Sequence, residues 1–380
     1  MKRRSFAFLL AAALLFPAAP AARAADLPIS APAALLMEKA TGTVLYAKDE
    51  HARFEPASVT KVMTLLLVME AIDSGRLSYD DTVTGSAHAS SMGGSQIWLR
   101  EGEQMSVRDL LKAVCVVSGN DASVALGEHL AGSEAAFVAR MNERAAQLGM
   151  NDTTFVNCTG LPAEGHLTSA YDIALMSREL ILNHPGIRQF TTIWMDTLRG
   201  GESELVNTNK LIRFYDGATG LKTGSTSTAG YCLSATAERE GMELIAVVLD
   251  GKTSDERFTD AKTLLNHGFA SYALHTVKPD AAIPPVPVTL GAQAYVQGVV
   301  EGEQTLLLAR EDVSALSQNM TLCEKVDAPV ARGDALGELT VFSGETVLAR
   351  IPIVAGEDVA KLTWGELFVR FFRTALGTLS

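Results

Sequence analysis

Apolar positions before residue 278 alternate between strand-like and helix-like patterns. Residues 34–37 and 43–46 are short apolar runs joined by Ala40-Thr41-Gly42, which predicts a hairpin. The segment 58–69 is apolar almost all round, as expected of a helix buried in a core. Further helical patterns follow, over residues 107–117, 123–130, 134–148 and 169–182.

Strand patterns return after residue 220. Residues 231–236 and 243–249 are apolar runs separated by Gly241, and a helical pattern follows over 254–269. Strands therefore flank a central helical block. The simplest arrangement is an antiparallel sheet closed by both ends of a domain over residues 25–277, with the helices as an insertion, which is an α+β fold.

The composition changes beyond residue 277. A proline-rich, extended stretch over residues 278–285 predicts a linker. Short strand-like runs without a good helical pattern follow, at residues 296–300, 304–308, 336–341 and 345–354. Residues 286–358 are therefore predicted to form a small all-β domain, a β-sandwich.

The last segment, residues 361–380, has the pattern of an amphipathic helix. Its apolar stripe is rich in aromatic residues and consists of Trp364, Leu367, Phe368, Phe371, Phe372, Ala375 and Leu379. Arg370 and Arg373 on the opposite face argue against a spanning helix and favour one that lies on the membrane surface as an anchor. A helix that packs back on the protein, or one that mediates oligomerisation, is the alternative.

The N-terminus has the features of a secretory signal. Lys2, Arg3 and Arg4 precede an apolar run over residues 5–16, and Ala22-Arg23-Ala24 offers small residues at a cleavage site. We expect residues 1–24 to be removed; an uncleaved anchor is the alternative. The run is too short to span a bilayer. The mature protein is thus expected to be extracytoplasmic, peripheral on the outer face of the cytoplasmic membrane.

Composition excludes several classes of function. The hydrophobic content of 47% excludes a disordered chain, and a net charge of −12 argues against nucleic acid as a partner. The four cysteines form no CxxC pair, and the seven histidines show no HxH or HExxH spacing. We therefore expect no metal site, and a zinc peptidase is disfavoured.

Ser58-Val59-Thr60-Lys61 is the first of three short motifs that carry chemistry. Pro56 stands where a helix would begin, which places Ser58 in the first turn and Lys61 on the same face. A serine hydroxyl needs a base to take its proton, and Lys61 is a base only when neutral. Burial and a second nearby lysine both lower a lysine pKa, and Lys222 is the candidate for that second lysine.

The other two motifs are Ser118-Gly119-Asn120 and Lys222-Thr223-Gly224. A hydroxyl and a carboxamide two residues apart can relay a proton and hold a substrate amide. The third motif is predicted to open a strand, where Lys222 and Thr223 can bind a carboxylate and a backbone N–H can complete an oxyanion hole. Each motif alone is weak evidence for an active site. The order, spacing and flanking residues of the three motifs together make the evidence specific.

These motifs and their flanks resemble those of penicillin-recognising serine enzymes, and more narrowly the serine-type D-alanyl-D-alanine carboxypeptidases, which are low-molecular-mass penicillin-binding proteins. The resemblance implies an acylated Ser58, Lys61 as its base and Ser118 as the group that protonates the departing D-alanine. It also implies a set of substrate-binding residues: Asn120, Lys222, Thr223, Gly224, Ser225 and Arg257. In this set, Ser225 shares the oxyanion hole with Ser58, and Arg257 assists carboxylate binding.

The same resemblance implies removal of the terminal D-alanine from peptidoglycan pentapeptide stems, without a cofactor, and acylation by β-lactam antibiotics. A β-lactamase is the first rival reading, but no E-x-x-L-N motif follows Ser118, and Glu164 stands in that region without the asparagine. A D,D-endopeptidase and a non-catalytic binding protein would share the same fold, and both remain alternative functions. The intact motif residues argue against the binding protein.

Overall fold

The computed structural model describes residues 27–302 and 304–375, so the expected signal peptide lies outside the described residues. The chain divides after Tyr272 into two compact units, and each is described by itself. Residues 278–285, between the strands β10 (Tyr272–Val277) and β11 (Val286–Thr289), contain no helix or strand.

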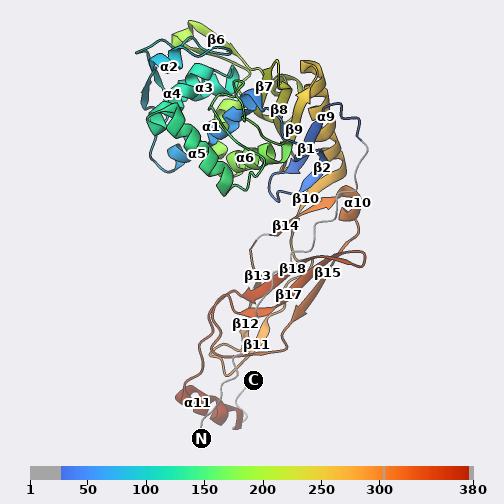
Figure 1. Ribbon diagram of the computed structural model, residues 1–380. Helices are drawn as coiled ribbons and strands as arrows, with labels where there is room; N and C mark the ends of the chain where they lie inside the picture. Colours follow the sequence, from blue (N-terminus) through green and yellow to red (C-terminus); the bar gives the residue numbers. More distant parts are fainter. Residues whose placement is uncertain (1–26, 303, 376–380) are drawn as a thin grey trace. The chain divides into compact units, whose positions relative to one another are not determined.

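The first unit is built on a five-stranded antiparallel sheet in the order β2-β1-β9-β8-β7 (Figure 1). Its strands are β1 (Ala33–Glu38), β2 (Val44–Lys48), β7 (Ala218–Thr226), β8 (Gly230–Arg239) and β9 (Met242–Gly251). The first strand pairs with the last, from Ala33 opposite Leu249 to Glu38 opposite Leu244. The predicted α+β class is confirmed, as is a sheet closed by both ends of the unit.

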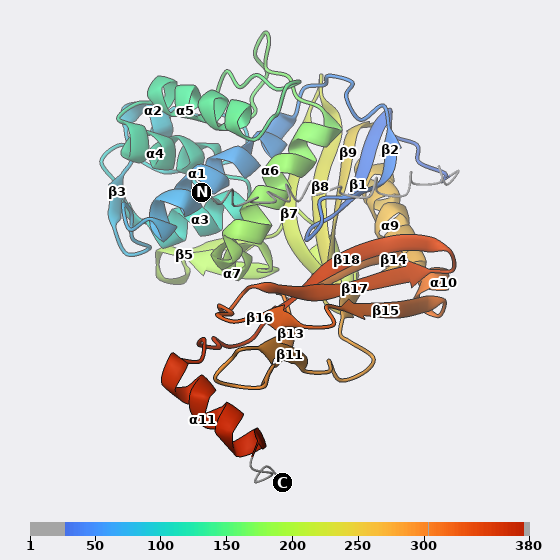
Figure 2. The same ribbon diagram turned by 90° about the horizontal axis from the view of Figure 1, so that it is seen from below.

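Helices cover both faces of this sheet (Figures 1 and 2). The helix α9 (Ser254–Ser271) lies on one face, and α6 (Ala170–Asn183) lies on the other together with the helical block. The remaining helices of that block are α1 (Lys61–Asp73), α2 (Ala87–Ser90), α3 (Val107–Val116), α4 (Asn120–Ala131), α5 (Glu134–Gln147), α7 (Arg188–Thr191) and α8 (Leu211–Phe214). Two small antiparallel sheets that the apolar pattern did not predict accompany them, β3 (Thr82–Thr84) with β4 (Gln104–Ser106) and the hairpin β5 (Met195–Leu198) with β6 (Ser203–Val206).

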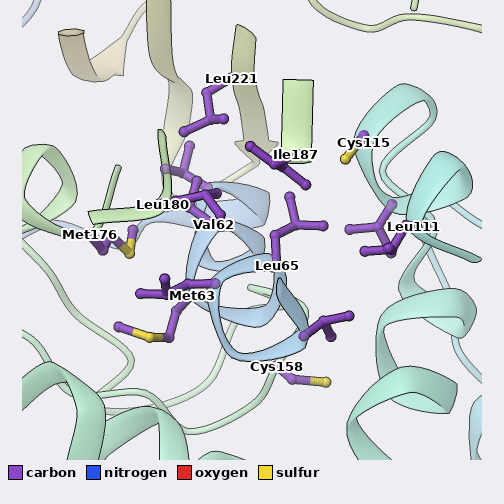
Figure 3. Close-up of a cluster of buried hydrophobic side chains, with 14 of the residues drawn as sticks. Val62, Met63, Leu65, Leu111, Cys115, Cys158, Met176, Leu180, Ile187 and Leu221 are labelled. Atoms are coloured by element: carbon purple, nitrogen blue, oxygen red, sulfur yellow. The ribbon is translucent and has the colours of Figure 1, made fainter. Parts of the chain in front are cut away.

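The helix α1 is the centre of the core. Figure 3 shows side chains from α3, α6 and β7 directed toward it, among them Leu111, Leu180 and Leu221. Burying a side chain of this size contributes about 1.5–3 kcal/mol, so the apolar surface of α1 fixes it between the sheet and the other helices. The few polar residues on α1 are therefore held in place by the packing around them.

The second unit is mainly β, as predicted. Its four-stranded antiparallel sheet has the order β13-β18-β17-β15, and a smaller sheet has the order β12-β11-β16. The strands beyond β11 are β12 (Tyr295–Val296), β13 (Gly298–Val300), β14 (Gln304–Ala309), β15 (Leu316–Leu322), β16 (Val326–Asp327), β17 (Ala335–Ser343) and β18 (Thr346–Ala355). The short helix α10 (Arg310–Val313) and the terminal helix α11 (Trp364–Ala375) complete the described part of this unit.

Candidate active site

Ser58 lies in a 3₁₀ turn, Ala57–Thr60, that leads directly into α1. Helical structure begins directly after Pro56 and contains Ser58 in its first turn, as predicted, but this turn is 3₁₀ and not α, and its first residue, Ala57, has a left-handed backbone (φ 47°). Lys61 is the first residue of α1. The spacing of three residues nevertheless brings the two side chains together, with Lys61 Nζ 2.8 Å from Ser58 Oγ.

Lys61 is fully buried, and its Nζ has three uncharged oxygen partners. It lies 2.6 Å from Asn120 Oδ1 and 2.7 Å from the carbonyl oxygen of Thr159, in addition to Ser58 Oγ. Burial, followed by the positive charge of Lys222, holds the pKa of Lys61 well below its usual value. Both causes are those that the sequence predicts for a lysine acting as a base.

The strand β7 passes directly beside the Ser58 turn. A Cβ added to Gly224 would lie 2.9 Å from both Pro56 O and Ser58 N, so only glycine allows this approach without a shift. Lys222 is the central residue of β7, and Thr223 and Gly224 follow it. The prediction that this motif opens a strand is therefore wrong, because the strand already begins at Ala218 and pairs with β8 from there.

Lys222 and Thr223 are both buried on β7. Lys222 Nζ donates to Thr223 O at 2.9 Å, and burial together with the charge of Arg257 lowers the pKa of Lys222 to about 7. Thr223 Oγ1 lies 2.7 Å from Thr208 Oγ1, whereas Ser225 is exposed. Strongly shifted pKa values cluster at functional sites, so two buried lysines with lowered pKa values mark this region as a candidate active site.

Ser118 and Asn120 stand at the turn between α3 and α4. Ser118 has a left-handed backbone (φ 64°), and its buried hydroxyl has no hydrogen-bond partner among the described residues. Asn120 begins α4, and its Nδ2 donates to Gly93 O at 2.7 Å while its Oδ1 accepts from Lys61. Asn120 thus links two of the three motifs, and the Ser118 hydroxyl is free to bond a substrate atom.

Arg257 is buried on α9 and directed at the backbone of two strands. Its Nη1 donates to Gly224 O at 2.9 Å and to Cys232 O at 3.2 Å, and its Nε has no partner in the described residues. In this structure, Arg257 therefore supports the Gly224 end of β7. Its predicted contact with a substrate carboxylate stays a prediction.

The sequence did not predict that the loop 156–168, which contains Glu164, bonds the polar residues of the Ser58 turn and α1. Besides the contact of Thr159 with Lys61, Thr64 Oγ1 donates to Cys158 O, and Thr60 Oγ1 lies 2.8 Å from His166 Nε2. The signal in the sequence was the polar set Thr60, Lys61 and Thr64 in an otherwise apolar segment. Buried polar side chains need partners, and spacing alone did not show what they were.

One cluster of potential metal ligands lies within the described residues. Glu70, Glu179 and His184 offer ligand atoms within 4.8 Å of one another. Arg144 already bonds both carboxylates, at 2.6 Å each. We therefore assign this cluster as an ion-pair network and place no metal there.

Comparison with known proteins identifies the family. Residues 19–253 match the model of the D-alanyl-D-alanine carboxypeptidase family of serine peptidases, and residues 274–361 match the C-terminal domain of penicillin-binding protein 5. This chain belongs to the D-alanyl-D-alanine carboxypeptidase family. The predicted resemblance to low-molecular-mass penicillin-binding proteins, and the predicted enzyme class, are confirmed.

Individual relatives cover between 64% and 99% of the chain. The D-alanyl-D-alanine carboxypeptidase DacF of Bacillus subtilis is 40% identical over 387 aligned positions, which cover 99% of this chain and 98% of DacF. The structure of penicillin-binding protein 5 from Haemophilus influenzae is similar with a TM-score of 0.74 and 30% identity, covering 88% of this chain and 98% of that one. Penicillin-binding protein D2 from Listeria monocytogenes, solved in an ampicillin-bound form, is similar with a TM-score of 0.59 and 36% identity, covering 64% of this chain and 100% of that one.

Proposed function

We propose that this protein is a penicillin-sensitive serine D,D-carboxypeptidase that removes the terminal D-alanine from peptidoglycan pentapeptide stems through an acyl-enzyme on Ser58. The observation that carries the proposal is the pair formed by Ser58 Oγ and the fully buried Nζ of Lys61. The family supports the same activity, because its members are named for it.

The donors and acceptors around Lys61 support its role as the base. A neutral amine has two N–H donors and one lone pair. Asn120 Oδ1, whose Nδ2 is committed to Gly93, and the Thr159 carbonyl accept the two N–H groups. The lone pair is then left for the proton of the Ser58 hydroxyl, and the lowered pKa of Lys61 favours the neutral amine.

In the acylation step, Ser58 Oγ attacks the carbonyl carbon between the two D-alanines, and its proton passes to Lys61. Backbone N–H groups of Ser58 and Ser225 hold the oxyanion. The C–N bond then breaks, and the proton returns through Ser118 to the amine of the departing D-alanine. Thr223 and Arg257 receive the terminal carboxylate, and Lys222 adds positive charge near it.

In the second step, water attacks the ester carbon and releases Ser58 and the shortened stem. β-Lactams would acylate the same serine, as expected from the ampicillin-bound form of the Listeria relative. Glu164 is exposed on the loop and lacks the asparagine of a β-lactamase motif, so we expect the penicillin adduct to be lost slowly.

We also propose that α11 anchors the protein on the outer face of the cytoplasmic membrane, after removal of residues 1–24. Within residues 27–302 and 304–375, none of the helices is long and apolar enough to cross a bilayer. The exposed aromatic residues of α11 support binding in the membrane interface instead, with Trp364 89%, Phe368 65% and Phe371 72% exposed.

The test is release of D-alanine from a diacetyl-Lys-D-Ala-D-Ala peptide by the chain without residues 1–24, compared with its Ser58→Ala variant. We expect release by the wild type and none above background by the variant. Folded wild-type protein that releases no D-alanine would contradict the proposal. In that case, a mass shift with penicillin would favour an endopeptidase or a binding protein, and its absence would argue against an acylated serine altogether.

A further inference from the structure

A tight turn over residues 157–161 lies against the nucleophile. The carbonyl of Thr159 in this turn accepts from Lys61 Nζ at 2.7 Å. Gly160 follows with φ +82°, and a Cβ added there would lie 1.8 Å from Ala57 O and 2.9 Å from Ser58 N. The turn therefore touches both members of the Ser58–Lys61 pair through its backbone.

The side chain of Asn157 organises this turn. Its Oδ1 accepts from Gly160 N at 2.7 Å, and from Thr159 N and Thr159 Oγ1 at 3.1 Å each. Its Nδ2 donates to Leu161 O at 2.9 Å. An asparagine side chain can bond backbone atoms a few residues later in the chain, in place of the hydrogen bonds of a helix or sheet. Here these bonds orient the Thr159 carbonyl.

That carbonyl decides where the Lys61 lone pair points. With Asn120 and Thr159 both accepting, the two N–H groups of neutral Lys61 are used, and only the lone pair faces Ser58. Without the Thr159 acceptor, an N–H can turn toward Ser58 Oγ, and the lone pair then no longer faces the serine proton. Displacements of about 1 Å in such a pair reduce rates by about 10²-fold.

We propose that Asn157 is a positioning residue for the Ser58–Lys61 pair, acting through the Thr159 carbonyl. The inference rests on the proposed function, since it concerns the proton transfer that acylates Ser58. It predicts that Asn157 affects the rate of acylation more than the binding of the acylating compound.

Asn142 offers a matched control in the same region. Its Oδ1 accepts from Phe155 N at 2.9 Å, and its Nδ2 donates to Phe155 O at 2.8 Å and to Val138 O at 3.1 Å. Two of these three bonds fasten Phe155, the residue directly before the loop, and both end two residues before the turn at 157–161. A purely structural effect would be shared by both asparagines.

The experiment measures the acylation rate and the dissociation constant of benzylpenicillin over pH 5–10, for wild type, Asn157→Ala, Asn157→Asp and Asn142→Ala. For Asn157→Ala we expect acylation to fall about 10- to 100-fold at every pH with little change in the dissociation constant. Asn142→Ala should acylate like wild type while unfolding at a lower denaturant concentration.

Asn157→Asp keeps the acceptor for Gly160 N and Thr159 N, loses the donor to Leu161 O and adds a negative charge beside the turn. This charge favours protonated Lys61, whose other charged or titratable neighbours are Lys222, Cys158 and Asp121. The acid limb of its acylation rate should therefore move to higher pH, with the rate approaching that of wild type at the alkaline end.

Equal rates for Asn157→Ala and wild type, or an equal loss in Asn142→Ala, would overturn the inference. If Asn157→Ala does not fold, the aspartate variant decides, because it keeps the acceptor, and an acylation rate that stays far below wild type at the alkaline end contradicts the inference. Wild-type protein that is not acylated would instead contradict the proposed function.

Discussion

At the scale of single residues, the site depends on burying two lysines whose hydrogen bonds go to uncharged oxygens. Lys61 bonds a hydroxyl, a carboxamide and a carbonyl, and Lys222 bonds a carbonyl. An ammonium group removed from water without a carboxylate partner is unfavourable, so the folded protein lowers both pKa values. The arrangement that makes a neutral base available also reduces the stability of the protein.

Replacement of Lys222 by methionine should stabilise the protein in a pH-dependent way. The pKa of Lys222 is about 7 in the folded protein and near 10.4 when unfolded, so the unfolded chain binds more protons between these values. Wild-type stability therefore rises with pH across this window. We expect Lys222→Met to be more stable by about 2–4 kcal/mol below pH 7, with the difference fading toward pH 10.5.

Urea unfolding at pH 6 and pH 10 measures this difference. Lys262→Met is the control, because Lys262 is exposed on α9 and should give no pH-dependent change. A Lys222→Met variant that is equally stabilised at both pH values would show that packing, and not ionisation, is the cause.

Site residues that act through their side chains could be predicted from the spacing of the sequence motifs. Ser58 and Lys61 are three apart, and Lys222 was expected as the second lysine; the structure brings all three together. The Thr159 carbonyl was not foreseeable, because every residue has a carbonyl and only the folded loop selects one. Asn157 was missed for the same reason, since its partners are backbone atoms.

At the scale of elements, α11 has a well-formed start and an exposed apolar face. Thr363 and Glu366 cap it reciprocally, with Thr363 N donating to Glu366 Oε2 at 2.7 Å and Glu366 N donating to Thr363 Oγ1 at 3.4 Å. The rings of Phe368 and Phe372 lie 5.2 Å apart on the helix. The helix is therefore specified locally, and its aromatic face is available to a membrane.

Replacing Phe368 and Phe371 by glutamate should release the protein from lipid vesicles. The two substitutions remove apolar surface and add charges that are unfavourable in the interface, so we expect at least a tenfold loss of bound protein in a sedimentation assay. Ser317→Glu with Asn319→Glu adds the same charge at exposed positions of β15 and should leave binding nearly unchanged. Undiminished binding of the phenylalanine variant would exclude α11 as the anchor.

Helices and strands whose apolar residues recur at regular intervals were predicted well. Elements that depend on contacts with distant parts of the chain were not. The helices α5 and α6 and the strands β8 and β9 lie where the apolar pattern placed them. The two-stranded sheet of β3 with β4 has only three residues in each strand, too few for a periodic signal. The helical start after Pro56 was predicted, whereas its 3₁₀ geometry was not, because nothing in the sequence indicates the left-handed backbone of Ala57.

At the scale of the whole molecule, the two ends of the catalytic unit are fastened together. Buried Asp260 on α9 accepts from Ala31 N at 2.8 Å, from Ser30 Oγ at 2.9 Å and from Ser30 N at 3.1 Å. These residues are 229 and 230 positions apart along the chain. The carboxylate therefore holds the segment that leads into β1 against the last helix of the unit.

Asp260→Ala should destabilise the protein by about 2–4 kcal/mol, because the buried N–H of Ala31 and the partly buried N–H of Ser30 lose their acceptor. Denaturant unfolding of the full chain measures the loss. Asp255→Ala, on the exposed first turn of the same helix, should cost less than about 1 kcal/mol. Equal effects of the two variants would mean that the contacts of Asp260 add little to stability.

The closing of the sheet by β1 and β9 also sets an order of events during synthesis. The segment with Ser58 is made early, whereas β7 begins 160 residues later (218 − 58) and the edge of β9 that receives β1 follows β7. At about 5–20 residues per second, the ribosome needs roughly 10–40 s to make that interval. During this time β1 has no neighbour on its β9 side and Ser58 has no strand beside it, so an unfinished chain contains the nucleophile without the site that activates it. Reactivity toward penicillin therefore reports completion of the whole catalytic unit.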